Sequence, residues 1–252
     1  MKILIGDIGN TLTKLCLISE KFKIIKEYNI KTAKIIKEKN IIKFLSPILK
    51  KDIKKKVLFS SVVPSVYQKI KKFIKTRKYQ SYEIKNLSLK KLIKIKIDKY
   101  NQLGSDRIAN AIGAYSLYKK NCIVVDFGTA TTFDIVRNPG VYEGGVIAPG
   151  IKLSILNLNR FTAALPIFEL KTDLKTYGKN TKDALNAGFL WGYQGLVNNI
   201  LKKIKTSFNC NFKIILTGGY SKIFFKFINN NTTIEPNITI EGIMHIYKNL
   251  IK

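Results

Sequence analysis

Two short segments of this 252-residue chain place an aspartate beside glycine and small polar residues. They are Asp7-Ile8-Gly9-Asn10-Thr11 and Asp126-Phe127-Gly128-Thr129, and each lies between two apolar runs. This pattern predicts a turn between two strands. Such turns expose backbone N–H groups and short side-chain donors that can hold phosphate oxygens. An aspartate there cannot bind phosphate directly, but it can hold a metal ion, or a metal-bound water, that bridges to phosphate.

The repetition of this segment carries more information than either copy. A single copy is explained about equally well by a purely structural Asx-type turn. The two copies lie about half the chain apart, and they align Asp7 with Asp126, Gly9 with Gly128, Asn10 with Thr129 and Thr13 with Thr132. The repeat predicts a duplicated α/β chain with an N-terminal half at 1–115 and a C-terminal half at 116–252.

A third candidate segment, Gly104-Ser105-Asp106-Arg107, stands at a predicted helix start. Asp106 can be a helix-capping acid, worth at most about 1 kcal/mol. It can also be a general base that takes the proton of an alcohol during phosphoryl transfer. Arg107 can bind a carboxylate or phosphate through two parallel hydrogen bonds. Thr217-Gly218-Gly219, after a predicted strand, can let the backbone lie against a ligand such as adenosine or can be a plain turn.

The elements that must position these residues follow from apolar periodicity. We expect strands at 2–6, 12–18, 57–59, 122–125, 133–136 and 212–216, one more within 84–99, and a glycine-rich loop at 143–150. We expect helices at 31–50 with a break near Pro47, at 65–77, from 105, and at 151–159, 181–203 and 238–252. In the helix at 181–203, the glycines at 188, 192 and 195 predict an inward face with close backbone packing.

The net charge of +29 first suggests nucleic acid, but only four of the 45 basic residues are arginine. Because the lysines are spread along the whole chain, a solvated basic surface is the better interpretation, and no specific nucleic acid is expected. The isolated Cys16, Cys122 and Cys210 are typical of buried thiols in a reducing cytoplasm. No apolar run approaches the length of a membrane span, so no membrane association is expected.

Six motifs occur in the order found in type III pantothenate kinases, which the chain resembles from residue 4 to about 220. They are DIGNT at 7–11, GSDR at 104–107, DFGTATTFD at 126–134, GGVIAPG at 144–150, GKNT at 178–181 and TGG at 217–219. The resemblance implies a duplicated actin-like (ribonuclease H-like) ATPase fold, with two similar halves around a nucleotide cleft. It implies ATP-dependent phosphorylation of the primary hydroxyl of pantothenate, the first step of coenzyme A biosynthesis. It also implies a cytoplasmic homodimer that uses K⁺ or NH₄⁺.

The resemblance also assigns residues by position. ATP contacts fall on Asp7, Ile8, Gly9, Asn10, Thr11, Leu12, Thr13, Lys14 and Thr129. Pantothenate contacts fall on Gly104, Ser105, Asp106, Arg107 and Thr181. Asp106 is the implied general base, and Asp126 is implied to help bind K⁺. Asp7 is expected to position the Mg²⁺ that accompanies ATP, directly or through water.

The chain departs from the family pattern at two places. Ser105 stands where the family usually has alanine. The family often has a tyrosine seven residues before the motif glycine, where this chain has Ile97. Either that contact is lost, or Tyr100 fills its role after a local shift.

Two rival functions also stay open: a kinase for another small acid or sugar, and a DNA-associated regulator.

Overall fold

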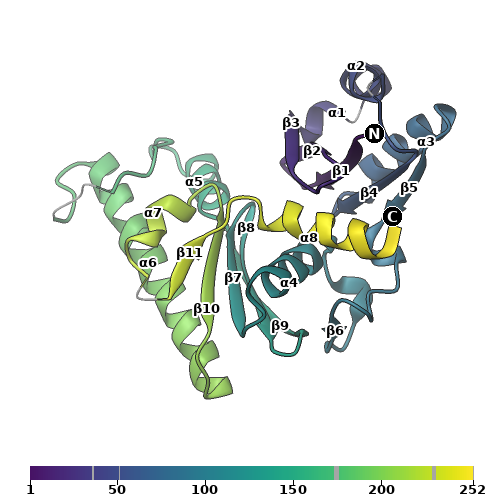
Figure 1. The fold of residues 1–252 in the computed structure, drawn as a ribbon. Helices are drawn as coiled ribbons and strands as arrows, with labels where there is room; N and C mark the ends of the chain where they lie inside the picture. The colour runs from purple at the N-terminus through teal and green to yellow at the C-terminus, as the bar shows by residue number, and fades with distance from the viewer. Residues whose placement is uncertain (36, 51, 173–175, 229–230, 252) are drawn as a thin grey trace. The chain divides into compact units, whose positions relative to one another are not determined.

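The computed structural model describes the chain except residues 36, 51, 173–175, 229–230 and 252 (Figure 1). The chain forms two compact units. Unit 1 comprises Met1–Lys119, Val136–Glu143 and Asn237–Lys252, and unit 2 comprises Lys120–Ile135 and Gly144–Pro236. Both units are built on β-sheets covered by helices, so the predicted α/β class is confirmed. Among the described helices, none has the length and apolar character that crossing a membrane would require.

Unit 1 contains a five-stranded sheet in the order β3-β2-β1-β4-β5. The strands are β1 (Ile3–Ile8), β2 (Leu12–Ile18), β3 (Ile24–Lys31), β4 (Lys56–Ser61) and β5 (Gln80–Glu83). The pairs β1–β2 and β2–β3 are antiparallel, whereas β1–β4 and β4–β5 are parallel. A tight turn therefore joins β1 to β2, and the carboxyl ends of β1 and β4 lie next to each other.

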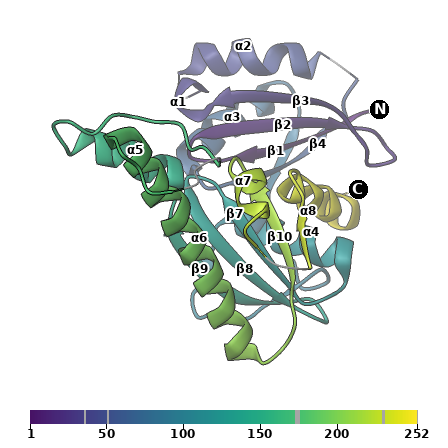
Figure 2. The same ribbon diagram turned by 90° about the vertical axis from the view of Figure 1, so that its left-hand side faces the viewer.

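Helices cover both faces of this sheet because its strands are apolar on both sides. One core contains residues of β1, β2 and β4 together with the apolar faces of α2 (Glu38–Leu49) and α3 (Pro64–Thr76). The short helix α1 (Thr32–Ile35) precedes α2, and residue 36 between them lies outside the described residues. On the other side, α8 (Ile238–Ile246) packs against β1 and lies beside α4 (Ser105–Tyr118), as Figure 2 shows. Thr239 joins these helices by donating to Asn110 Oδ1 at 2.7 Å.

The second sheet repeats the strand order of the first. Its order is β11-β10-β7-β8-β9-β6, so β9-β8-β7-β10-β11 matches β3-β2-β1-β4-β5. The strands are β6 (Lys94–Ile95), β7 (Cys122–Phe127), β8 (Ala130–Arg137), β9 (Val141–Pro149), β10 (Lys213–Gly218) and β11 (Thr232–Ile234). As in the first sheet, the central strand β7 has a parallel neighbour, β10, and β10 pairs in parallel with β11. This shared topology supports the predicted duplication.

Unit 2 places its helices over one face of the second sheet. Its core combines residues of β7, β8 and β10 with α5 (Ile151–Arg160), α6 (Thr181–Phe208) and α7 (Ser221–Phe225). Figure 2 shows the long helix α6 running beside the strands. Aromatic side chains fill much of the space: Phe127 stacks on Phe224 at 5.1 Å between ring centroids, and Phe189 stacks on Tyr193 at 5.9 Å.

The predicted strands are confirmed, including the one within 84–99, which is β6. The predicted helices at 65–77, from 105, at 151–159 and at 181–203 are also confirmed, to within a few residues at their ends. The helix at 238–252 forms as α8 followed by the π-helical turn η3 (Tyr247–Ile251), and residue 252 lies outside the described residues. The strands β3, β5, β9 and β11 are additional to those that the sequence predicts.

Two local predictions were wrong. Pro47 does not break the helix but lies inside α2. The buried apolar residues Ile41, Leu45 and Ile48 hold α2 in the core, and this packing outweighs the lost backbone bond. The glycine-rich segment 143–150 is not a loop: it is most of strand β9, because sheet pairing overrides the low strand propensity of glycine.

The predicted inward face of α6 was also wrong. The buried residues are Asn186, Ala187, Leu190, Tyr193, Val197, Leu201 and Ile204. Gly188, Gly192 and Gly195 lie instead on the exposed side, and a Cβ atom built on any of them meets nothing within 4 Å. The neighbouring Trp191 is 46% exposed. In the described chain, α6 therefore has a packed face and an open face of small and apolar residues.

The compact units divide the chain differently from the predicted halves 1–115 and 116–252. Residues 136–143 join unit 1, where the Tyr115 hydroxyl lies 3.3 Å from the side-chain oxygen of Asn138. Residues 237–252 join unit 1 through the packing of α8 on α4. The halves remain a prediction about the repeat, whereas the units describe which residues pack together.

The described cysteines are free thiols. Cys16 on β2 and Cys122 on β7 are buried, as predicted, whereas Cys210 is only partly buried. Burial raises the pKa of Cys16 to about 12 and that of Cys122 to about 11.

Candidate functional site

The turn between β1 and β2 holds its predicted shape through backbone and side-chain hydrogen bonds. The Gly9 N–H donates to the carbonyl of Leu12 at 3.0 Å. Asn10, Thr11 and Leu12 are exposed, so their donors can meet a ligand. Ile8 and Thr13, also predicted to contact ATP, are fully buried, which leaves their backbone as the part that could take part.

Thr32, at the start of α1, braces this turn and was missed from the sequence. Its hydroxyl donates to the carbonyl of Gly9 at 2.7 Å, and its N–H donates to the carbonyl of Thr11 at 3.0 Å. The hydroxyl of Thr13 lies 3.0 Å from that of Thr32. Nothing in its local sequence marks Thr32, because the contact depends on the path of β3 back along β2.

Asp7 lies near the end of β1, is partly exposed, and has one buried carboxylate oxygen, Oδ1. Burial first, and the nearby Asp106 carboxylate second, raise its pKa to about 7. Ser60, its partner on β4, and Lys14, its partner on β2, act in the opposite direction. Asp7 Oδ1 is buried and has no hydrogen-bond partner among the described residues. A buried carboxylate oxygen without a donor is costly, and a bound cation would satisfy it.

Lys14, the last residue of the predicted ATP segment, is tied to its own unit. Its Nζ lies 3.7 Å from Glu27 Oε2 on β3 and 3.3 Å from Asn237 Oδ1, just before α8. The ammonium group is therefore held beside the strand pair that carries Asp7.

Asp106 occupies the first turn of α4 and is only partly exposed. Its Oδ1 accepts a hydrogen bond from the Arg107 N–H at 2.8 Å. Burial raises the pKa of Asp106, against the opposing effects of the Arg107 N–H and of the Arg107 charge. A Cβ atom at Gly104 would collide with the Asp106 carboxylate, so glycine at this position leaves room for it. A partly shielded carboxylate with a raised pKa suits a general base.

The surroundings of Asp106 within unit 1 can hold a small molecule. A hollow of about 440 Å³ lies beside the segment, lined by residues that include Val62, Glu83, Leu103 and Gly104. This volume is in the range of small-molecule sites. The guanidinium of Arg107 lies over the Tyr142 ring, 6.0 Å from its centroid, and this contact orients the arginine.

Tyr100, one of the two candidates for the missing tyrosine, lies in the 3₁₀ turn η2 (Tyr100–Gln102) and is 38% exposed. Burial and the charge of Glu83 raise its pKa. Glu83 in turn accepts a hydrogen bond from Ser105. Tyr100 therefore lies near the start of α4, which favours it for the missing role.

The second turn, between β7 and β8, resembles the first but is one residue shorter. The Gly128 N–H donates to the carbonyl of Ala130 at 3.1 Å, where Gly9 donates to Leu12. The first residue of β8 thus corresponds to the first residue of β2, and Thr13 corresponds to Thr131, not to Thr132 as the sequence alignment predicted. Burial agrees, since Thr13 and Thr131 are both fully buried.

Asp126 lies beside this second turn, where backbone segments approach closely. A Cβ atom at Gly218 would lie 2.7 Å from Asp126 Oδ1 and 2.6 Å from the carbonyl oxygen of Phe127. Gly218 also has a φ of +83°, which favours glycine. The Gly219 N–H donates to Phe127 O at 3.2 Å, so the Thr217-Gly218-Gly219 segment is fastened to the strand that carries Asp126. The segment is thus a close neighbour of Asp126 and Phe127 within unit 2.

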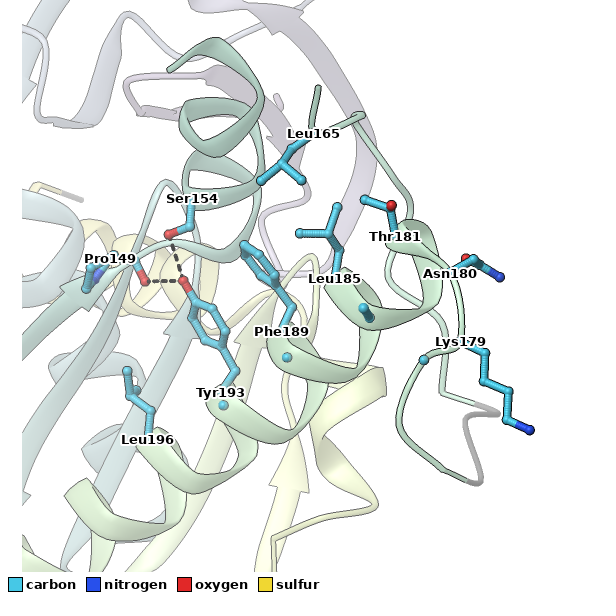
Figure 3. Close-up of a pocket in the computed structure, with 14 residues that line it drawn as sticks. Pro149, Ser154, Leu165, Lys179, Asn180, Thr181, Leu185, Phe189, Tyr193 and Leu196 are labelled. Carbon is cyan, nitrogen blue, oxygen red and sulfur yellow. Dashed lines mark hydrogen bonds between the residues drawn. The ribbon is translucent and has the colours of Figure 1, made fainter. Parts of the chain in front are cut away.

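Thr181 begins α6 and is exposed. Asn180 caps the helix by accepting from the Asp183 N–H at 3.0 Å. Figure 3 shows Thr181 at the edge of a hollow of about 940 Å³ whose wall includes Leu185, Phe189 and Tyr193. The Tyr193 hydroxyl donates to Pro149 O at 3.2 Å and lies 2.9 Å from Ser154 Oγ, which ties α6 to β9 and α5.

The predicted site residues thus fall into two groups. Unit 1 brings together the 7–14 turn and the 104–107 segment, since Asp106 acts electrostatically on Asp7. Unit 2 carries Asp126, Thr129 and Thr181. Among the residues that the structure describes, no three His, Cys, Asp or Glu side chains cluster to hold a metal ion. A divalent ion held by one carboxylate fits Mg²⁺, which keeps several waters and binds substrate phosphates.

Comparison with known proteins identifies relatives of the whole chain. The model of the type III pantothenate kinase family matches residues 3–203. The type III pantothenate kinase of Pelagibacter ubique is 46% identical over 244 residues, covering 96% of this chain and 97% of the relative.

Solved structures show the same fold at low sequence identity. One is a protein from Campylobacter jejuni assigned to the Baf family of transcriptional activators, with a TM-score of 0.62, 20% identity and coverage of 97% of both chains. Another is a protein assigned as a sugar kinase from Cytophaga hutchinsonii, with a TM-score of 0.52, 13% identity and coverage of 98% of this chain and 100% of the other. With the repeated strand order, these likenesses confirm the predicted duplicated actin-like fold.

Proposed function

The chain belongs to the type III pantothenate kinase family, an ATP-dependent kinase family of coenzyme A biosynthesis, and we propose that Asp106 is its general base. The observation that carries this assignment is the position of Asp106. Its carboxylate is held at a helix start by the Arg107 N–H and has a raised pKa, and Gly104, two residues before it, lines a hollow in unit 1. A base so placed takes the proton of the primary hydroxyl of pantothenate as that oxygen attacks the γ-phosphorus of ATP.

The nucleotide residues of the proposal are those of the two turns. The exposed backbone and side chains of Asn10 and Thr11 donate to phosphate oxygens, and Thr129 does so from the second turn. Thr32 keeps the first turn in shape by holding the carbonyls of Gly9 and Thr11. The donors are therefore in place before ATP arrives, which lowers the entropic cost of binding it.

The metal assignments rest on single carboxylates. Asp7, with its unpartnered buried oxygen, is the residue that would hold Mg²⁺, directly or through water. Asp126 would help hold K⁺ or NH₄⁺ near the second turn. When bound, these cations offset the negative charge of the phosphates. The kinase family itself implies ATP with a divalent metal.

Pantothenate is proposed to contact Gly104, Asp106, Arg107 and Thr181, whereas Ser105, the remaining predicted contact, has no exposed surface and bonds to Glu83. The Arg107 guanidinium can pair with the carboxylate of pantothenate or with a phosphate oxygen. Tyr100, near Glu83 and the start of α4, is the residue we assign to the tyrosine role that Ile97 does not fill.

The test of the function is ATP consumption by the purified chain. We expect ADP formation that depends on pantothenate and on Mg²⁺ and that rises when K⁺ or NH₄⁺ replaces Na⁺. A panel of other small acids and sugars serves as the control for acceptor choice. Turnover with another acceptor but not with pantothenate would overturn the substrate, and equal rates in Na⁺ and K⁺ would overturn the monovalent site.

We also propose that the chain is a cytoplasmic homodimer and that the open face of α6 lies in its interface. This face presents Gly188, Gly192 and Gly195 with Trp191 and has space above it. Small residues in such a row let another helix approach closely, and unpaired apolar surface of this kind marks interaction sites.

A single substitution can test the interface without disturbing the subunit. A Cβ atom built at Gly188 meets nothing within 4 Å, and the position is exposed, so Gly188→Arg should fold normally. We expect it to convert a dimer into a monomer in sedimentation velocity. Thr206→Arg adds the same side chain at an exposed position near the far end of α6 and should remain dimeric. A monomeric parent protein, or a dimeric Gly188→Arg variant, would contradict the proposal.

A further inference from the structure

Glu83 is a buried carboxylate that the proposed reaction leaves without a role. It ends β5 and is 7% exposed, and burial raises its pKa. Its Oε2 accepts from the Lys85 N–H at 2.8 Å, and its Oε1 accepts from the hydroxyl of Ser105. The backbone of Ser61, at the end of β4, also favours its charged form. One carboxylate therefore joins β4, the 3₁₀ turn η1 (Ile84–Asn86) and the start of α4.

Ser105 is the first residue of α4 and has no exposed surface. The residue before it, Gly104, has no side chain with which to cap the helix. The next residue is Asp106. The Ser105–Glu83 hydrogen bond therefore fixes the first turn of the helix from outside, directly beside the base.

We propose that Glu83 and Ser105 form a positioning pair that holds the Asp106 carboxylate in its reactive place. Glu83 lines the hollow of unit 1, but both of its carboxylate oxygens are engaged by the protein, and it acts through Ser105 and the helix backbone. The proposal rests on Asp106 being the base. It extends that assignment by giving a role to the buried Glu83 and to Ser105, which meet in the fold at the start of α4.

The physical reason is the sensitivity of proton transfer to distance. A displacement of about 1 Å between base and hydroxyl can cost a hundredfold in rate. A hydrogen bond to a charged, buried acceptor is stronger than an ordinary one. Removing the Ser105 hydroxyl also leaves Glu83 Oε1 buried without that donor, so the local structure must rearrange.

The test is a set of variants assayed per folded enzyme. We expect Ser105→Ala to lower kcat for pantothenate by between about tenfold and a hundredfold, with the KM for ATP unchanged within about twofold. Glu83→Ala should lower kcat similarly. Because each substitution removes the same bond, the kcat of the double variant should be no lower than that of the less active single variant. Glu83→Gln keeps an oxygen acceptor for Ser105 and should retain more activity than Glu83→Ala.

Matched measurements separate positioning from stability. Ser116→Ala removes another hydroxyl of α4, one that bonds to Gly113 O within the helix, and should keep the parent kcat. If the pair were merely structural, Ser105→Ala would lower the melting temperature but leave kcat per folded enzyme unchanged. That result would overturn the proposed positioning pair. So would a double variant in which the fold-losses in kcat of the two single variants multiply. If Glu83→Ala does not fold, Glu83→Met, which fills the space of the side chain without offering Ser105 an acceptor, takes its place in the double-mutant cycle.

Failure of the pair can be distinguished from failure of the proposed function. The parent enzyme is first shown to phosphorylate pantothenate, and Asp106→Asn is assayed beside the other variants. An active Asp106→Asn variant would overturn the base itself. An inactive Asp106→Asn variant beside a fully active Ser105→Ala variant would overturn the positioning pair alone.

Discussion

Asp106→Asn is expected to lower kcat by about two orders of magnitude or more while ATP still binds. Asparagine keeps the size and the acceptor oxygen of Asp106 but cannot take a proton from the substrate hydroxyl. The Arg107 N–H can still donate to the amide oxygen, so the helix start should remain formed. The measurements are steady-state kinetics with pantothenate and calorimetric binding of ATP.

The control for this variant tests the capping explanation of Asp106. Glu241 lies in the first turn of α8, in the same unit, where it also favours the helix N-terminus. Glu241→Gln should therefore resemble Asp106→Asn in stability but not in kcat. Turnover of Asp106→Asn within a few fold of the parent would remove Asp106 from the chemistry.

The pH dependence of the parent enzyme provides a second test of the same residue. A general base must be deprotonated before it accepts a proton, so activity should fall as the pH drops through the pKa of Asp106. Because burial raises that pKa, the fall should begin at higher pH than for an exposed aspartate. In Asp106→Asn, the residual rate should lose this dependence.

Asp7→Asn is expected to abolish the Mg²⁺ dependence of ATP binding while it stabilises the protein without ligand at neutral pH. The folded-state pKa of Asp7 is about 7, above the ordinary aspartate value of 3.8. The folded protein therefore binds more protons than the unfolded chain between these values, and stability falls as pH rises from about 4 to about 7. Ionisation of Asp7 then costs at most about 4 kcal/mol above pH 7. Asparagine removes this cost.

Urea unfolding at pH 5 and pH 7.5 checks the stability result, and ATP titrations with and without Mg²⁺ check the metal. Asp98→Asn, at an exposed position of unit 1, makes the same chemical change and should alter neither result. An Asp7→Asn variant that binds Mg²⁺–ATP like the parent would show that Asp7 only braces the turn. If the parent and Asp7→Asn lost the same amount of stability as the pH rises from 5 to 7.5, the titrating group would be a residue other than Asp7.

The sequence predicted the parts of this chain in which local pattern and tertiary packing agree. The two Asp-Gly turns are such parts, because the apolar runs on either side can be satisfied only as paired strands. The α6 helix is a different case. It is apolar on more than one side, so its periodicity predicts a helix without indicating which face is buried. The glycines at 188, 192 and 195 were consistent with close packing, but in the described chain they face open space.

Contacts between distant segments were beyond the sequence for another reason. Thr32 and Glu83 are ordinary residues in their local context, and each acquires its role from a turn or helix start elsewhere in unit 1. The one-residue difference between the two turns has the same origin. An ungapped alignment pairs Thr13 with Thr132, whereas the backbone hydrogen bond of each turn pairs Thr13 with Thr131.

The two buried thiols give each unit its own reporter of opening. Cys16 lies in the sheet of unit 1 and Cys122 in that of unit 2, and burial keeps both largely protonated and out of reach of alkylating reagents. Each thiol can therefore be labelled only when its own sheet opens, whereas the partly buried Cys210 can react earlier. The order in which Cys16 and Cys122 acquire label, followed by mass spectrometry, would show whether the two sheets unfold together or one after the other.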